Sequence, residues 1–343
     1  MPARNDEKLM RVALAEARRG VGQVSPNPAV GALLERSGRI IATGYHRASG
    51  LPHAEVECLA AAGNRSLRAA TLFVTLEPCS TTGRTPPCTE AIIASGIRRV
   101  VIGAMDVNPA HAGRAMAQLQ AAGMEVKSGV LAEECARLNE AFNKWIVTGQ
   151  PFVIAKCGMS LDGRLTRLPN ESRWLTGALA RRSAMGLRAE VDAILIGAET
   201  LRQDNPRLTI RGIKGVRQPW RVVVSRSGNL PAGAHLFTDR FADRTLVYRG
   251  KSLRSVLTDL GRKKITSVLI EGGGEVLGQA FDAHLVDKVQ FYLAPLLTAG
   301  LVVAVGGKGA ADTRSGAHLA EPQFTRIGPD LSVSGYPRWS ATE

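Results

Sequence analysis

The fold of this chain is decided by three short segments, His53-Ala54-Glu55, Pro78-Cys79 and Pro87-Cys88. The residues around them predict a helix over residues 54–62, a buried strand over residues 71–76 and a second helix over residues 88–95. Each segment therefore lies where a strand or a loop leads into a helix. Strands that alternate with helices in this way are typical of a three-layer α/β domain.

The same segments contain the side chains of a catalytic metal site. The imidazole of His53 and the thiolates of Cys79 and Cys88 supply three of the four ligands of a tetrahedral zinc ion and leave the fourth position for water. Glu55, two residues after the histidine, is placed to take a proton from that water and pass it to a departing nitrogen. The pattern H-x-E with P-C-x-x-C is the signature of zinc-dependent nucleobase deaminases, although here eight residues separate the two cysteines.

The rest of the sequence continues the alternation of strands and helices. In the first half, we also expect strands over residues 30–34, 39–43, 97–103 and 124–127 and helices over residues 7–19 and 113–122. A turn signal at Thr148-Gly149-Gln150-Pro151 predicts a domain boundary. In the second half, we expect strands over residues 152–157, 193–196, 221–224, 245–248, 266–270 and 288–293 and helices over residues 178–189, 252–262 and 275–282. The chain is thus predicted to form two α/β domains, residues 1–148 and 149–343.

Length and composition indicate a globular protein with no membrane segment. A chain of 343 residues suits two hydrophobic cores, and no apolar run reaches membrane-spanning length. The five cysteines are odd in number and no secretion signal precedes them, so we expect no disulfides and a cytoplasmic location. The net charge of +14 suits nucleic acid or anionic metabolites, but the scarcity of aromatic residues, 5%, favours metabolites.

Five motifs of the first half resemble the deaminase half of the bifunctional riboflavin-biosynthesis deaminase–reductase family. They are Ser25-Pro26-Asn27-Pro28, Gly44-Tyr45-His46, His53-Ala54-Glu55, Thr75-Leu76-Glu77-Pro78-Cys79-Ser80 and Gly83-Arg84-Thr85-Pro86-Pro87-Cys88. The eight-residue gap between the cysteines is typical of this family. The resemblance implies a cytidine-deaminase-like domain that hydrolytically deaminates 2,5-diamino-6-(5-phosphoribosylamino)pyrimidin-4-one. It also implies that Asn27 and His46 bind this substrate.

The second half resembles the reductase half of the same family, which is similar in fold to dihydrofolate reductase. The motifs that carry the resemblance are Ser160-Leu161-Asp162-Gly163-Arg164, Ser172-Arg173-Trp174-Leu175-Thr176-Gly177, Gly197-Ala198-Glu199-Thr200 and the stretch that begins Asp204-Asn205-Pro206. No G-x-G-x-x-G follows a strand, so the sequence does not support a Rossmann nucleotide site. The resemblance implies NADPH-dependent reduction of the ribosyl group to ribityl, which gives 5-amino-6-(5-phosphoribitylamino)uracil.

The resemblance assigns ligand-binding roles in this half residue by residue. The expected cofactor-binding residues are Gly158, Trp174, Thr200, Asp204, Gly273, Gly274, Glu275, Val276, Leu277, Gly278 and Gln279. The expected substrate-binding residues are Ser172, Arg188, Leu208, Arg211 and Glu271. Arg188 and Arg211 suit bidentate capture of a phosphate. Trp174 could stack on the nicotinamide or belong to the core, and Gly273 would let a phosphate approach the backbone and could adopt a positive φ.

The chain departs from the family pattern at several positions. In the first half, Thr81 stands where a histidine is usual and Val107 where a proline is usual. In the second half, Gly158 replaces a usual alanine, Met185 a histidine and Ser225 an aspartate. None of these positions is a zinc ligand or the proposed proton carrier. We therefore expect them to alter loop shape and ligand affinity and not the class of reaction.

Two other functions are compatible with parts of the sequence. A tRNA deaminase with an appended domain would account for the basic charge, but the long gap between Cys79 and Cys88 disfavours it. A non-catalytic scaffold with a structural zinc would need a fourth protein ligand, which the local loop lacks, and would not need Glu55. We therefore expect a phosphorylated pyrimidine as the ligand, no nucleic-acid or membrane partner, and a homo-oligomer of unspecified size.

Overall fold

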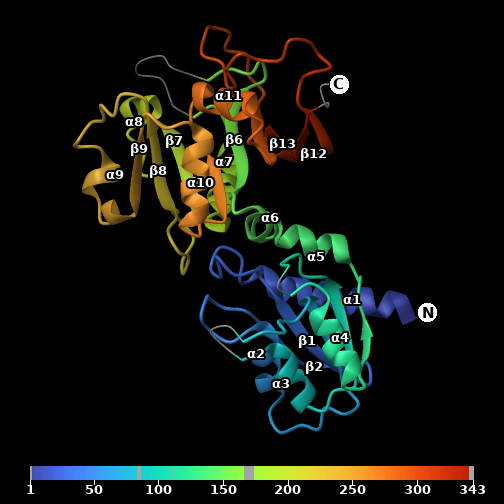
Figure 1. Ribbon diagram of the computed structural model, residues 1–343. Helices are drawn as coiled ribbons and strands as arrows, with labels where there is room; N and C mark the ends of the chain where they lie inside the picture. The colour runs from blue at the N-terminus through green and yellow to red at the C-terminus, as the bar shows by residue number, and fades with distance from the viewer. Residues whose placement is uncertain (1, 83–85, 110, 166–173, 340–343) are drawn as a thin grey trace. The chain divides into compact units, whose positions relative to one another are not determined.

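The structure is a computed structural model that describes residues 2–82, 86–109, 111–165 and 174–339 (Figure 1). The chain separates into two compact units, Met1–Gly149 and Gln150–Glu343. This division lies one residue from the boundary that the turn signal predicts. Each unit contains its own sheet.

The N-terminal unit is built on a five-stranded sheet with the strand order β2-β1-β3-β4-β5. Its strands are β1 Gly31–Arg36, β2 Arg39–Tyr45, β3 Thr71–Leu76, β4 Arg99–Ala104 and β5 Glu125–Lys127. Its helices are α1 Pro2–Arg18, α2 Ala54–Ala62, α3 Cys88–Ala94, α4 Arg114–Ala121, α5 Ala132–Leu138 and α6 Glu140–Thr148. Strand β1 pairs antiparallel with β2 and β3, and β3, β4 and β5 run parallel.

Helices cover both faces of this sheet. Helix α1 packs on β1 and β3, while α2, α3 and α4 form a layer in which successive helices touch (Figure 1). All six residues of β3 are buried, which requires cover on both faces. The carboxyl end of this central strand therefore opens onto the starts of α3 and α4, and this is where Cys79 lies.

The C-terminal unit contains an eight-stranded sheet with the order β12-β13-β11-β6-β10-β7-β8-β9. Its strands are β6 Phe152–Ser160, β7 Ala193–Gly197, β8 Trp220–Ser225, β9 Thr245–Arg249, β10 Ser267–Ile270, β11 Lys288–Ala294, β12 His318–Ile327 and β13 Asp330–Arg338. Its helices are α7 Ala178–Glu190, α8 Ala198–Asp204, α9 His235–Thr238, α10 Leu253–Arg262 and α11 Gly274–Asp282, with a 3₁₀ turn at Ala242–Arg244. The six neighbouring strands β11, β6, β10, β7, β8 and β9 are parallel, so their carboxyl ends all lie at the same end of the sheet.

Most of the predicted elements are present, and two, α2 and β3, have the predicted bounds. The hairpin of β12 and β13 was not predicted. Strand β12 is largely exposed and contains Pro322, so its sequence shows no alternation of apolar and polar residues. Within the described residues, no helix has both the length and the apolar character that crossing a bilayer requires.

Candidate metal centre and cofactor cavity

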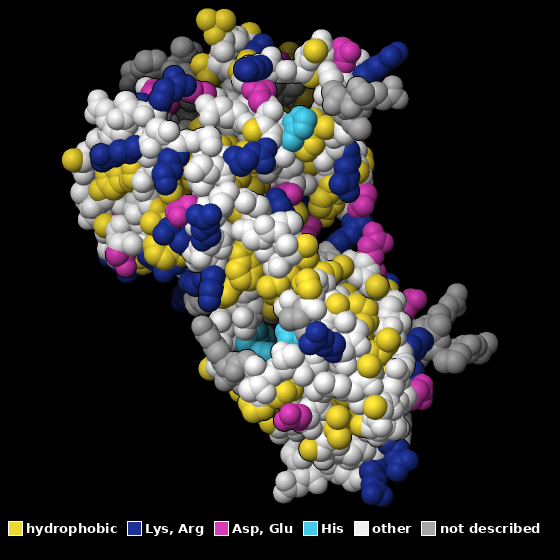
Figure 2. Space-filling model, in the orientation of Figure 1, with side chains coloured by type: hydrophobic (Ala, Val, Ile, Leu, Met, Phe, Trp, Pro, Cys, Tyr) yellow, Lys and Arg dark blue, Asp and Glu magenta, His cyan; other side chains and the backbone are white. Residues whose placement is uncertain are grey.

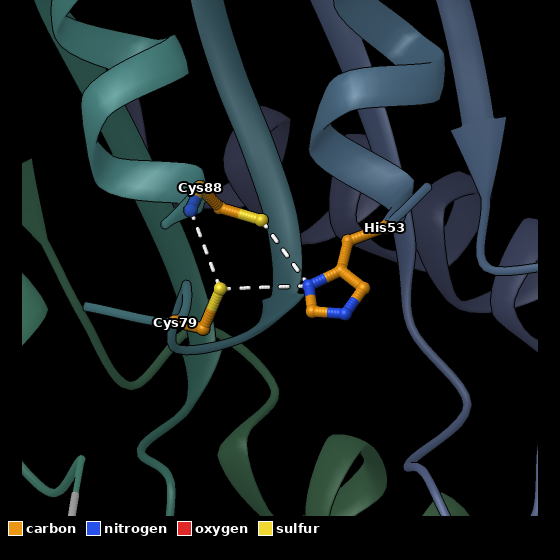
Figure 3. A group of neighbouring side chains, drawn as sticks. All are labelled: His53, Cys79 and Cys88. Carbon is orange, nitrogen blue, oxygen red and sulfur yellow. Dashed lines mark hydrogen bonds between the residues drawn. The ribbon is translucent and has the colours of Figure 1, made fainter. Parts of the chain in front are cut away.

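Three side chains from three elements converge in the N-terminal unit (Figure 3). His53 precedes α2, Cys79 follows β3, and Cys88 is the first residue of α3. The Nδ1 atom of His53 lies 3.5 Å from the Sγ atom of Cys79 and 3.3 Å from that of Cys88. All three ligand atoms lie within 4.8 Å of one another.

This geometry fits a tetrahedral zinc ion. Zinc bonds of about 2.0–2.1 Å to nitrogen and 2.3 Å to sulfur place tetrahedral ligands roughly 3.6 Å apart. The observed nitrogen–sulfur distances agree with that value. Hydrogen bonds to Cys79 from the Cys88 side chain, from His53 and from the Cys88 N–H group lower the pKa of the Cys79 thiol to about 4. A thiolate is the form that binds a metal.

Glu55 lies beside the ligand set and is 3% exposed. It belongs to the first turn of α2, and its side chain interacts with the thiol of Cys88. Burial raises the pKa of Glu55 to about 7. The structure therefore places a carboxyl group next to the three candidate ligands, as the sequence predicted.

The two other residues expected in this site contact each other. The amide Nδ2 of Asn27 donates to Nε2 of His46 over 3.0 Å. This direction follows because Nδ1 of His46 donates to the carbonyl oxygen of Pro52, also over 3.0 Å. Burial lowers the pKa of His46, and its ring meets that of His53 edge to face at 5.1 Å. Figure 2 shows histidine side chains at the floor of a hollow in this unit.

Glu77 organises the loop below the metal centre, a role that the sequence did not reveal. Its buried carboxylate accepts hydrogen bonds from four backbone N–H groups. These belong to Asp106, Gly113, Ala115 and Met116. The anionic side chain thus caps the N-terminus of α4 and ties it to the end of β3, two residues before Cys79.

The two departures in this half lie in exposed or half-exposed positions. The hydroxyl of Thr81 is 3.4 Å from Nδ1 of His111, which follows the loop that Glu77 holds. Val107 is 43% exposed. Neither residue belongs to the metal-ligand group formed by His53, Cys79 and Cys88.

The C-terminal unit contains a cavity of about 1030 Å³ at the carboxyl ends of β6, β10 and β7. Nine of the predicted ligand-binding residues line it, namely Gly158, Trp174, Arg188, Thr200, Asp204, Leu208, Arg211, Glu271 and Gly273. Ser172 lies outside the described residues. Trp174 is 50% exposed, which excludes its interpretation as a core residue. Met185, one of the departures, also lines the cavity.

A buried ion pair between Arg188 and Glu271 forms part of the cavity wall. Arg188 donates from Nε and Nη2 to the two carboxylate oxygens of Glu271, each over 2.7 Å, and from Nη1 to the carbonyl oxygen of Thr209. Lys156 Nζ is 3.8 Å from Glu271. Burial alone would raise the pKa of Glu271, but Lys156 and Arg188 lower it to about 2. The guanidinium of Arg188 is therefore paired with Glu271.

The glycine segment differs from its predicted form. Gly273 has φ −63° and ψ 173°, so the expectation of a positive φ was wrong, and its N–H donates to Thr200 Oγ1 over 3.1 Å. Gly274 and Glu275 line a second cavity of about 460 Å³. Val276, Leu277 and Gly278 are buried, and a side chain at Gly278 would meet the backbone of Gly306 at 2.2 Å. Gly278 therefore allows the backbone at Gly306 to pack closely against α11.

The structure also adds cavity residues that the sequence did not single out. They include Lys156, Arg181, Arg182, Arg207, His235 and Tyr292. Lys156 offered one signal, because it is the charged residue of the otherwise apolar strand β6. The others come from three separate elements and loops, and only the fold brings them together.

Comparison with known proteins identifies the family. Residues 151–333 match the model of the RibD C-terminal domain, and residues 3–104 match the cytidine and deoxycytidylate deaminase zinc-binding region. The riboflavin biosynthesis protein RibD of Bacillus amyloliquefaciens is 37% identical over 97% of this chain and 96% of that protein. The chain belongs to the RibD family. The Escherichia coli member is 36% identical over 96% of this chain and 98% of its own length.

Solved structures of the RibD family agree with the fold. Acinetobacter baumannii RibD, form 1, has a TM-score of 0.89 and 32% identity and covers 98% of this chain and 99% of its own. The Thermotoga maritima diaminohydroxyphosphoribosylaminopyrimidine deaminase/5-amino-6-(5-phosphoribosylamino)uracil reductase has a TM-score of 0.89, 34% identity and coverage of 98% and 100%. The predicted fold class is confirmed.

Membership of the RibD family confirms the predicted class of function. The chain is a deaminase and a reductase of riboflavin biosynthesis, and its cofactors are zinc and NADPH. The tRNA-deaminase alternative is not supported, because the similarity to RibD proteins extends over nearly the whole chain.

Proposed function

We propose that residues 1–148 deaminate 2,5-diamino-6-(5-phosphoribosylamino)pyrimidin-4-one and that residues 149–343 reduce the ribosyl group of the product. The observation that carries the proposal is the convergence of His53, Cys79 and Cys88 beside Glu55. The two activities for which the Thermotoga maritima relative is named support the choice of substrate. The final product would be 5-amino-6-(5-phosphoribitylamino)uracil.

In the deaminase unit, His53, Cys79 and Cys88 would hold the zinc ion. Zinc, when bound, lowers the pKa of a water ligand and so supplies a nucleophile near neutral pH. The carboxylate of Glu55 would accept a proton from the attacking water and donate it to the departing ammonia. Asn27 donates one amide hydrogen to His46, so its amide oxygen can accept a hydrogen bond from an amino group of the pyrimidine.

In the reductase unit, the cavity of about 1030 Å³ would hold the nicotinamide end of the cofactor and the substrate. NADPH, when bound, supplies the hydride for the carbon of the opened sugar. Arg207 and Arg211 line the cavity and are exposed within it, which suits them to the ribose phosphate. Lys156 and Glu271 would orient the opened ribose through hydrogen bonds, and Arg188 would fix Glu271 in place.

The remaining cofactor residues are proposed with narrower roles than the resemblance implied. Thr200, Asp204 and Gly273 line the main cavity, while Gly274 and Glu275 line the second one beside it. Val276, Leu277 and Gly278 are buried, so they would act by shaping the first turns of α11. Gln279 bonds with Glu275 and would support that residue.

The two-step reaction is tested by incubating the zinc-loaded protein with the diaminopyrimidine substrate, with and without NADPH. We expect ammonia and 5-amino-6-(5-phosphoribosylamino)uracil without NADPH, and the reduced ribityl product when NADPH is present. Absence of ammonia under both conditions would contradict the proposed deamination. Ammonia without a reduced product would contradict the proposed reduction alone.

We also propose a cytoplasmic homo-oligomer that does not bind nucleic acid. Edge strand β12 carries Phe324 at 65% exposure, and Leu301 is 98% exposed; self-association would cover exposed apolar side chains of this kind. Part of the basic charge lies in the cavity wall, where it suits a phosphorylated metabolite. Light scattering tests the assembly, and a tRNA-binding assay across salt concentrations tests the absence of nucleic-acid binding.

A further inference from the structure

A pair of exposed arginines lies beyond the cavity, at the carboxyl ends of β8 and β9. Arg226 follows β8, and its side chain is 88% exposed. Arg249 ends β9 and is exposed. The two strands are neighbours, with Ser225 paired to Arg249. The two arginines are therefore carried at the ends of adjacent strands, at the same end of the sheet as the cavity.

The turn that carries Arg226 is held by hydrogen bonds and lies against Arg249. Ser225 accepts the N–H of Gly228 at its hydroxyl, over 3.0 Å, and the N–H of Gly250 at its carbonyl, over 2.9 Å. Gly228 has φ +79°, and a Cβ atom there would lie 2.7 Å from Cδ of Arg249. The stem of Arg249 thus lies across the turn. A third arginine, Arg202, donates to the carbonyl oxygen of Asn229 over 2.7 Å and fixes the far end of the turn.

The turn is connected to the segment that would hold the cofactor. Arg226 Nη2 lies 3.0 Å from Oε1 of Glu275, in the first turn of α11. Both side chains are largely exposed, and an exposed ion pair of this kind is weak. A phosphate group that bears two negative charges would compete for Arg226 effectively. Ser225, where an aspartate is usual in the family, leaves this turn with one negative charge fewer.

The order of the strands defines the path from the cavity to this turn. The cavity lies over β6, β10 and β7, and the next strands along the sheet are β8 and β9. Neighbouring strands are about 4.8 Å apart, so β9 lies roughly 14 Å from β10. In α/β sheets, extended nucleotides lie across the carboxyl ends of the strands. A dinucleotide with its nicotinamide in the cavity would thus extend its adenosine toward Arg226 and Arg249.

We propose that Arg226 and Arg249 bind the 2′-phosphate of the adenosine ribose of NADPH and so select NADPH over NADH. The inference rests on the proposed assignment of residues 149–343 as the reductase. Arginine suits a phosphomonoester, because its planar guanidinium group donates two parallel hydrogen bonds. NADH carries only a neutral hydroxyl group at this position, so these side chains make no ionic contact with it.

Binding measured by calorimetry on the zinc-loaded full chain tests this inference. We expect Arg226→Gln and Arg249→Gln each to raise the dissociation constant of NADPH about ten- to hundredfold, the loss typical of one charged hydrogen-bonded contact, with little change for NADH. Arg262→Gln is the matched control, since it removes the same charge at the end of α10. This helix leads into the amino end of β10, at the opposite end of the strands from the cavity. We expect the control to change neither constant.

A second pair of probes separates the 2′-phosphate from the other phosphates of the cofactor. Adenosine 2′,5′-bisphosphate should bind the wild-type chain and lose affinity in both variants, whereas 5′-AMP should be indifferent to them. Equal weakening of NADPH and NADH, or of both adenosine probes, would overturn the proposal. Unchanged NADPH binding in both variants would overturn it as well. If the wild-type chain bound neither dinucleotide, the proposed reductase function itself would fail.

Discussion

Glu55 is enclosed beside two thiols and an imidazole, so a substitution that keeps its volume isolates its chemistry. Glu55→Gln should keep the fold and the zinc content, because glutamine fills the same space and Glu55 is not one of the three ligands. Deamination should fall about a hundred- to ten-thousand-fold, since an amide cannot carry the proton. Ammonia release and metal analysis on the same preparation check this. Near-normal ammonia release would remove Glu55 from the mechanism.

Cys88 belongs to the proposed ligand set, whereas Cys58 provides a matched control. Cys88→Ser should leave the purified protein with little zinc, because one of three ligands is lost. Cys58 is buried in α2 of the same unit, and burial raises the pKa of its thiol to about 12, so it stays protonated. Cys58→Ser should retain stoichiometric zinc. Equal zinc contents in the two variants would exclude Cys88 as a ligand.

At the scale of elements, the loop between β10 and α11 should affect cofactor binding and stability separately. Gly273 lines the cavity at φ −63°, a backbone conformation that valine can adopt, so Gly273→Val should weaken NADPH binding at least about tenfold with little change in melting temperature. Gly278→Val should instead lower the melting temperature, because its side chain would meet the backbone of Gly306. Unchanged NADPH affinity in Gly273→Val would refute a role for this loop in binding the cofactor.

The ion pair between Glu271, which follows β10, and Arg188 of α7 should make stability depend on pH. Glu271 has a pKa of about 2 in the fold against an ordinary value of 4.5, so it stabilises the folded state fully above pH 4.5. That contribution, of the order of 3 kcal/mol, is lost as the pH falls from 4.5 toward 2. The melting temperature of wild-type protein should therefore exceed that of Glu271→Gln most above pH 5, and the difference should shrink in acid. Glu275→Gln, at an exposed site, should show no such trend.

The sequence predicted those elements whose pattern is local. Strand β3 consists of apolar residues and two threonines, which favour strands, and α2 ends at a glycine, so both have the predicted bounds. Strand β12 is an exposed edge strand, and only its pairing with β13 makes it a strand. The same distinction holds for the sites. The proposed zinc ligands could be predicted from their spacing, whereas the partners of Glu77 and the pairing of Arg188 with Glu271 depend on contacts between residues far apart in the chain.

At the scale of the whole molecule, the chain consists of two compact units, each with a site of its own. The proposed metal ligands lie in Met1–Gly149 and the proposed cofactor cavity lies in Gln150–Glu343. No residue that we assign to one site belongs to the other unit. The central claim is therefore that the two reactions are performed by separate sets of residues on one chain and can be separated by mutation.

The most direct test supplies the deaminated intermediate, 5-amino-6-(5-phosphoribosylamino)uracil, to the Glu55→Gln protein and follows the oxidation of NADPH. Wild-type protein and Gly273→Val serve as the two references. We predict that Glu55→Gln oxidises NADPH at close to the wild-type rate while releasing almost no ammonia from the diaminopyrimidine, and that Gly273→Val shows the reverse. Loss of NADPH oxidation in Glu55→Gln, with the intermediate supplied and the zinc retained, would contradict the assignment of the two reactions to separate sites.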